Sequence, residues 1–92
     1  MPKRRHILTL PDLGLGSREV VASLWLVEPG SPLNAGDRLL EVLSGSVTVD
    51  LPAPAGGVLV ETLVVEDEPL AIGQPLAIIE SDEEEAAAPI ED

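Results

Sequence analysis

The side chains that could take part in chemistry are few in this chain of 92 residues, and they gather around one predicted hairpin. Ser46 carries a hydroxyl directly after Gly45, and the carboxylates of Glu41 and Asp50 stand on either side of it. The chain has no cysteine, and His6 is its only histidine. We therefore expect no thiolate nucleophile, no Ser-His arrangement and no multi-histidine metal set. The chemistry left to consider is a group held out on Ser46, or acid-base work by the two carboxylates.

The carboxylates are expected to be solvated rather than catalytic. Glu41 and Asp50 are predicted to be diagonal neighbours on the outer hairpin face, with Cα atoms about 7–8 Å apart. Carboxylate pairs at such separations hydrolyse glycosides. The chain has one Trp and no Tyr or Phe, and no apolar pocket or substrate platform is evident. A hydrolase that loses turnover in Glu41→Gln is thus the least favoured hypothesis. The acidic run over 66–68 lacks the spacing of a calcium loop, so no metal site is predicted.

Strands, not helices, are predicted to position these residues. The chain contains eight glycines and nine prolines, and no apolar spacing of the helical kind persists for three turns. Between the glycines and prolines lie runs rich in Val, Ile and Leu, which are typical of strands in sandwiches and barrels. The predicted strands cover residues 6–10, 20–27, 38–43, 46–51, 58–65 and 75–79.

A weak internal repeat indicates that the fold has two similar halves. A shift of 37 residues places seven residues on identical ones, and those in the first copy are Val21, Leu26, Val27, Pro32, Leu33, Gly36 and Leu39. Two copies are too few for a solenoid, and each copy has the order strand, Pro-containing corner, Gly turn, strand. We predict an all-β fold in which two similar sheets, related by a two-fold axis, bury their apolar faces together.

The predicted hairpin spans RLLEVLSGSVTVDL, with its turn at Ser44 and Gly45 because glycine adopts a positive φ at low cost. This register places Leu43 opposite Ser46. The side chain of Ser46 then points outward beside the tip, where a modified residue would be presented. The inward face is predicted to consist of Leu40, Val42, Val47, Val49 and Leu51.

Three long stretches of the chain carry a family resemblance. They are LPDLGLG (10–16), WLVEPGSPLNAGDRLLEV (25–42) and VTVDLPAPAGGVLVETLVVEDEPLAIGQPLAII (47–79). Together they resemble the lipoyl domain of 2-oxo acid dehydrogenase acyltransferases, within the biotinyl and lipoyl attachment family. The resemblance implies a flattened barrel or sandwich of two four-stranded sheets with quasi-two-fold symmetry. It also implies that the hairpin tip is where this family holds its swinging cofactor.

The chain departs from the family at that tip. Where the family has an acid followed by the modified lysine, this chain has Gly45 and Ser46, and its only lysine, Lys3, lies outside the matched region. A serine hydroxyl is a weaker nucleophile than a deprotonated amine and would form a more labile ester than the lysine amide. We predict that Ser46 carries no lipoyl group and that no cofactor is bound. Its setting also differs from the Asp-Ser-Leu motif of phosphopantetheine carriers, and other modifications stay open. A second departure is Leu15, where the family commonly has an acid.

Charge divides the chain into three parts and indicates its partners. Seventeen acidic residues against five lysines and arginines give a formal net charge of −12. We predict a basic N-terminal arm over residues 1–6, a lipoyl-like domain over 7–80 and an acidic Ala/Pro tail or linker start over 81–92. A field of this sign repels nucleic acid and anionic lipid and favours a protein with a basic docking surface. No signal peptide or membrane span is predicted, so the cytoplasm is the expected location.

Two functions follow from the resemblance and its departure. The first is a noncovalent docking or structural module related to 2-oxo acid dehydrogenase complexes, whose components are the expected partners, without enzyme activity of its own. The alternative is a part of a dihydrolipoyl acyltransferase component whose swinging arm is carried on another domain or chain.

Overall fold

A computed structural model describes residues 4–16 and 19–81, and their regular structure consists of strands. All six predicted strands are present, with two further strands of two residues. The strands are β1 (Arg4–Thr9), β2 (Val20–Trp25), β3 (Pro32–Leu33), β4 (Arg38–Ser44), β5 (Val47–Pro52), β6 (Gly57–Thr62), β7 (Pro69–Leu70) and β8 (Pro75–Ser81). No helix in these residues is long and apolar enough to cross a membrane. β1 takes in the last residues of the predicted basic arm, and of the predicted tail only Ser81 lies within the described residues.

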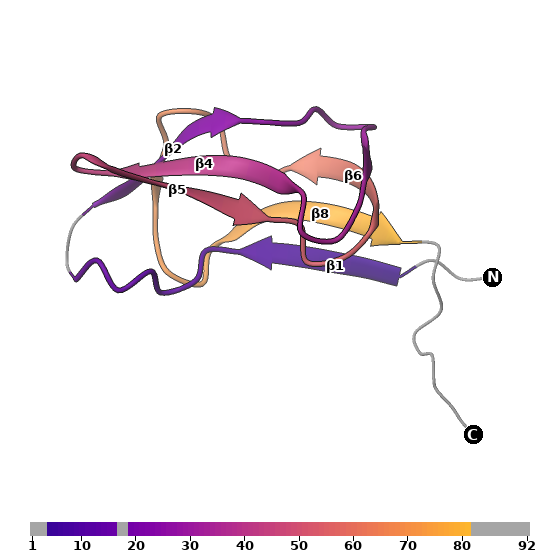
Figure 1. Cartoon of the computed structure of the whole chain (residues 1–92), viewed down its shortest axis with the longest axis horizontal. Coiled ribbons are helices and arrows are strands. Elements are labelled where there is room, and N and C mark those ends of the chain that lie inside the picture. The colour runs from indigo at the N-terminus through magenta and orange to yellow at the C-terminus, as the bar shows by residue number, and fades with distance from the viewer. Residues whose placement is uncertain (1–3, 17–18, 82–92) are drawn as a thin grey trace, which may run out of the picture.

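The strands form two four-stranded antiparallel sheets, as predicted. Their orders are β1-β8-β6-β3 and β5-β4-β2-β7. The short strands β3 and β7 each join the sheet that holds the central strands of the other half, so the two halves of the chain interlock. The hairpin of β4 and β5 reaches the end of the molecule away from the start of β1 and the end of β8 (Figure 1).

The core is aliphatic and lies between the two sheets. Each Leu, Ile or Val that is fully buried stabilises the fold by about 1.5–3 kcal/mol relative to its exposed state. Trp25 packs half-buried against this core, and its Nε1–H donates to the carbonyl of Val64 at 3.0 Å. The buried hydrophobic residues are Leu8, Leu10, Ala22, Leu33, Leu39, Leu40, Val42, Leu51, Ala53, Leu59, Val64, Leu76, Ala77 and Ile79.

The 37-residue repeat is seen in the hydrogen bonds as well as in the sequence. The amide of Ala22 donates to Glu68 at 2.9 Å, and the amide of Leu59, 37 residues later, donates to Ser31 at 3.0 Å. Strands β4 and β8 have the same order of buried and exposed residues. The register of β2 shifts between residues 22 and 24, and that of β6 shifts between residues 59 and 61. The two halves are therefore related by a quasi-two-fold axis, as the repeat predicts.

Candidate functional site

The hairpin turn consists of Gly45 and Ser46, one residue later than predicted. The last pair of the ladder joins Ser44 to Val47, so Leu43 lies opposite Thr48 and the predicted pairing of Leu43 with Ser46 is wrong. The reason is the backbone at Gly45, whose φ is +61°, whereas Ser46 is not among the residues with positive φ. A turn that needs positive φ only at its first central residue is the type II′ turn, and it matches the twist of the flanking strands.

In the observed register residues 40–43 of β4 each pair with a residue of β5 two positions later than predicted. Because side chains alternate between the faces of a strand, a shift of two residues leaves the predicted inward and outward faces unchanged. Val42 pairs with Val49, and Leu40 pairs with Leu51. Leu40, Val42 and Leu51 are buried as predicted. Val47, which was assigned to the core, is 36% exposed, because it pairs at the last rung before the turn.

Ser46 is exposed at the end of the domain, in the second position of the turn. The eight residues from 42 to 49 carry no charge, so the tip presents hydroxyls, apolar side chains and backbone groups but no ionised side chain. A serine needs an adjacent general base to act as a nucleophile. His6 lies on β1 and pairs with Ile79 of β8. Both strands belong to the sheet that does not contain the hairpin. Within residues 4–16 and 19–81, the structure therefore places Ser46 in an exposed position without an imidazole beside it.

Glu41 and Asp50 are direct cross-strand partners, so their predicted diagonal placement is wrong. Each carboxylate is engaged by a different neighbour. The hydroxyl of Ser23 donates to Oε2 of Glu41 at 3.1 Å, and Nη1 of Arg38 lies 3.2 Å from Oδ2 of Asp50. These contacts fasten neighbouring strands to one another and do not arrange the two carboxylates around a substrate.

The acidic run over 66–68 serves the backbone. Glu66 Oε2 accepts the amide of Trp25 at 3.0 Å, and Glu68 Oε1 accepts the amide of Val65 at 3.0 Å. Within residues 4–16 and 19–81, no three His, Asp or Glu side chains gather in a way that could hold a metal ion.

Ser44, directly before the hairpin turn, is a feature that sequence reasoning missed. Its side chain is 1% exposed, and its hydroxyl has no hydrogen-bond partner in the part of the chain that the structure describes. Ser81 lies 37 residues later at the end of β8 and is also buried. This serine pair extends the repeat by one identity, which was the available signal.

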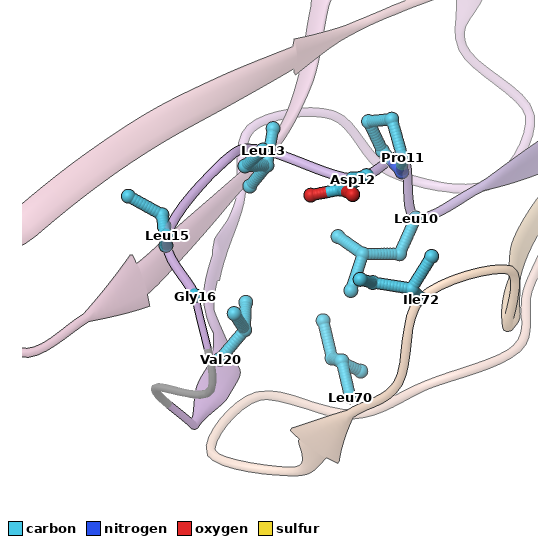
Figure 2. A pocket seen from close by; sticks show the side chains of 9 residues that line it. All are labelled: Leu10, Pro11, Asp12, Leu13, Leu15, Gly16, Val20, Leu70 and Ile72. Carbon is cyan, nitrogen blue, oxygen red and sulfur yellow. The ribbon is translucent and has the colours of Figure 1, made fainter.

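An apolar pocket of about 190 Å³ was also missed. It lies under residues 10–16, between the ends of β1 and β2 on one side and β7 on the other. The side chains of Leu10, Val20 and Leu70 converge on it, and the carboxylate of Asp12 lies at its edge (Figure 2). Val21 follows the lining residue Val20 and pairs with Leu43, two residues before the turn, so the pocket lies at the same end of the domain as the hairpin tip.

Comparison with known proteins decides the family. The family model described as biotin-requiring enzyme, which covers biotin and lipoyl domains, matches residues 6–79. The chain belongs to this biotin and lipoyl family. It is 35% identical over 80 residues to the dihydrolipoyllysine-residue acetyltransferase component of the acetoin cleaving system of Pseudomonas putida. This alignment covers 87% of this chain and 22% of the relative. The chain is also 35% identical over 83 residues to the acetyltransferase component of the pyruvate dehydrogenase complex of Corynebacterium glutamicum, which covers 90% of this chain and 12% of the relative.

A solved structure supports the same fold. The lipoyl domain of the 2-oxoglutarate dehydrogenase complex from Azotobacter vinelandii superposes with a TM-score of 0.65 and 18% identity, covering 79% of this chain and 92% of that one. The fold of the chain is thus similar to that of this lipoyl domain over most of its length. It spans less than a quarter of the two acyltransferase components.

Proposed function

We propose that this chain is a lipoyl-domain-like module that docks noncovalently within an assembly of the 2-oxo acid dehydrogenase type and carries no lipoyl group. The observation that carries the proposal is Ser46. It occupies the exposed tip position at which the resembling family has its modified lysine, while the sheets and core of the fold are retained. The domain itself is proposed to be non-catalytic.

The chemistry of the tip supports the absence of the arm. A lipoyl group is held by an amide to an ε-amine, and residues 4–92 contain no lysine. Gly45 stands where the family has an acid, so a carboxylate that an attachment enzyme could read is missing as well. An ester on Ser46 would need a general base to activate the hydroxyl. The chain's one histidine, His6, lies on β1, in the sheet that does not contain the hairpin.

Charge supports the docking role. The formal net charge of −12 produces a field that accelerates encounter with a basic surface. The two relatives are components of an acetoin cleaving system and of a pyruvate dehydrogenase complex, so other components of such assemblies are the proposed partners. Contact of this kind weakens as salt rises, since the Debye length falls to about 8 Å at physiological ionic strength.

A binding titration tests this proposal. The full 92-residue chain is titrated against each purified component of the source organism's 2-oxo acid dehydrogenase complexes, at low and at physiological salt. We expect one component to bind and its affinity to fall as salt is raised. If no component binds even at low salt, the docking function is wrong.

A second candidate rests on the short coverage of the relatives. The chain spans only 22% and 12% of the two acyltransferase components, so most of each component lies outside the matched region. A second lipoyl domain, in a longer protein or on a partner chain, is compatible with this coverage. In that case the swinging arm belongs to the other domain. Peptide mapping of the native protein for a lipoyl-lysine outside residues 1–92 distinguishes this arrangement from the first.

A further inference from the structure

The pocket lies where the two halves of the domain differ. The link from β5 to β6 covers residues 53–56, whereas the equivalent link from β1 to β2 covers residues 10–19. The short link lies flat, since a Cβ on Gly56 would be 3.4 Å from the carbonyl oxygen of Leu33. Residues 10–16 of the long link lie over the pocket. The length of this link therefore departs from the quasi-symmetry of the two halves.

Side-chain size also differs between the end of the domain with the long link and the end with the short link. By the 37-residue repeat, Val20 corresponds to Gly57, and Ile72 corresponds to Ala35. The end with the long link thus has the larger apolar side chains at both of these positions. Ile72 is 63% exposed at the pocket, which is a high exposure for an isoleucine next to other apolar side chains. Leu15, also at the pocket, stands where the resembling family commonly has an acid, so part of the apolar character is this chain's own.

Volume and charge restrict what the pocket would accept. A space of about 190 Å³ suits one bulky side chain, because an engineered apolar cavity of about 150 Å³ binds benzene. Asp12 adds a fixed negative group at the edge, since its Oδ1 accepts the amide of Gly14 at 2.9 Å. Among the described residues no cationic side chain pairs with this carboxylate. The complementary ligand has an apolar group with a positive charge beside it.

We propose that the pocket formed by Leu10, Leu13, Val20, Leu70 and Ile72 docks one bulky apolar side chain of a partner protein, and that a neighbouring lysine or arginine of the partner pairs with Asp12. The inference rests on the proposed docking function and names the contact through which it occurs. The chain's net charge of −12 favours the same basic partner at long range.

The direct test is a titration of the isotope-labelled full chain at low salt, followed by the shifts of its backbone amide NMR signals. The probe is the blocked peptide Gly-Arg-Phe-Arg-Gly, compared with Gly-Arg-Ala-Arg-Gly, with Gly-Glu-Phe-Glu-Gly and with lipoamide. We expect shifts at residues 10–16, 20 and 70–72, and binding about fivefold or more tighter for the first peptide than for the other three probes. Equal binding of the alanine peptide, or tighter binding of lipoamide, overturns the assignment.

Two pairs of variants localise the contact. Ile72→Ala should weaken the first peptide about fivefold, whereas Val65→Ala, at a side chain 68% exposed elsewhere, should leave binding unchanged. Asp12→Asn keeps the oxygen that accepts the Gly14 amide and removes the charge, so it should weaken binding about threefold. Glu61→Gln removes the same charge on β6 and should have no effect. If the controls weaken binding as much as the pocket variants do, the pocket is not the site.

The same variants separate this inference from the proposed function. If the unaltered chain binds a dehydrogenase-complex component and both pocket variants bind it equally well, the pocket inference fails and the docking function stands. If the unaltered chain binds no component, the docking function fails, and the peptide titration still judges the pocket.

Discussion

Gly30 and Asp67 occupy equivalent positions in the two halves of the domain, 37 residues apart. The backbone amide of each residue donates a hydrogen bond to the other half. Gly30 donates its amide to the carbonyl of Leu59 at 2.7 Å, and Asp67 donates to the carbonyl of Ala22 at 2.6 Å. Both have left-handed backbone, with φ of +93° and +74°. These reciprocal bonds tie the link between β2 and β3 to β6, and the link between β6 and β7 to β2. The backbone conformation at both positions is therefore set by the fold rather than by the residue type.

Substitution at this pair should have opposite effects on stability. Gly30→Ala introduces a Cβ at positive φ and should lower the free energy of unfolding by about 1 kcal/mol. Asp67→Gly removes that strain and should be neutral or raise it by up to about 1 kcal/mol. Urea denaturation of both variants measures the difference, and equal destabilisation by the two would contradict the equivalence of the two corners.

Gly57 is predicted to be the glycine least tolerant of change among those described. A Cβ at this position would meet the carbonyl of Glu80, 2.8 Å from its carbon, and φ is +148°. We expect Gly57→Ala to destabilise the domain by about 3 kcal/mol or more, because two paired strands would have to separate. Gly56→Ala is the matched control and should cost less than about 1 kcal/mol, since its nearest atom would be 3.4 Å away. Thermal unfolding distinguishes the two variants.

Ser44→Ala should stabilise the protein. The buried hydroxyl has no partner among the described residues, and a buried polar group left unpaired costs about 1–3 kcal/mol. We expect a gain of about 1 kcal/mol in denaturant unfolding. Ser31→Ala is the control, because the Ser31 hydroxyl accepts the amide of Glu28 at 3.3 Å and its loss should be neutral or destabilising. A loss of stability in Ser44→Ala would show that this hydroxyl is bonded in solution.

The hairpin tip should recover attachment when the amine is returned. Ser46→Lys places an ε-amine at the second turn position, and a lipoate ligase supplied with lipoate should modify it. Gly45→Asp adds the family's acid but puts an aspartate where φ is +61°, a conformation that aspartate tolerates at a cost of about 1 kcal/mol. Intact mass of the single and double variants checks the outcome. If neither is modified, the tip has lost the shape that the ligase reads.

The sequence predicted the architecture because the core is patterned locally. Alternating apolar runs, turn glycines and the 37-residue repeat are enough to identify the main strands and the two-fold arrangement. The strands β3 and β7 were missed because two residues that begin with a proline have no period to detect. The turn was displaced by one residue because Ser44-Gly45 and Gly45-Ser46 both place a glycine in the loop, and only the sign of φ at the first position separates them.

The pocket and the buried serine could not be predicted for a different reason. Both depend on how residues far apart in sequence meet. Residues 10–16 line the same pocket as Leu70 and Ile72, and Ser44 is buried although it directly precedes the exposed turn. The exposure of Ser46 at the end of the hairpin, in contrast, was predicted from the sequence, although its place inside the turn was not.

The central claim is most directly tested by the intact mass of the unaltered chain after co-expression with a lipoate ligase and excess lipoate, with Ser46→Lys as the positive control. The account predicts that the control gains the mass of one lipoyl group and that the unaltered chain keeps the mass of its sequence. A lipoyl adduct that peptide mapping locates on the unaltered chain would contradict it.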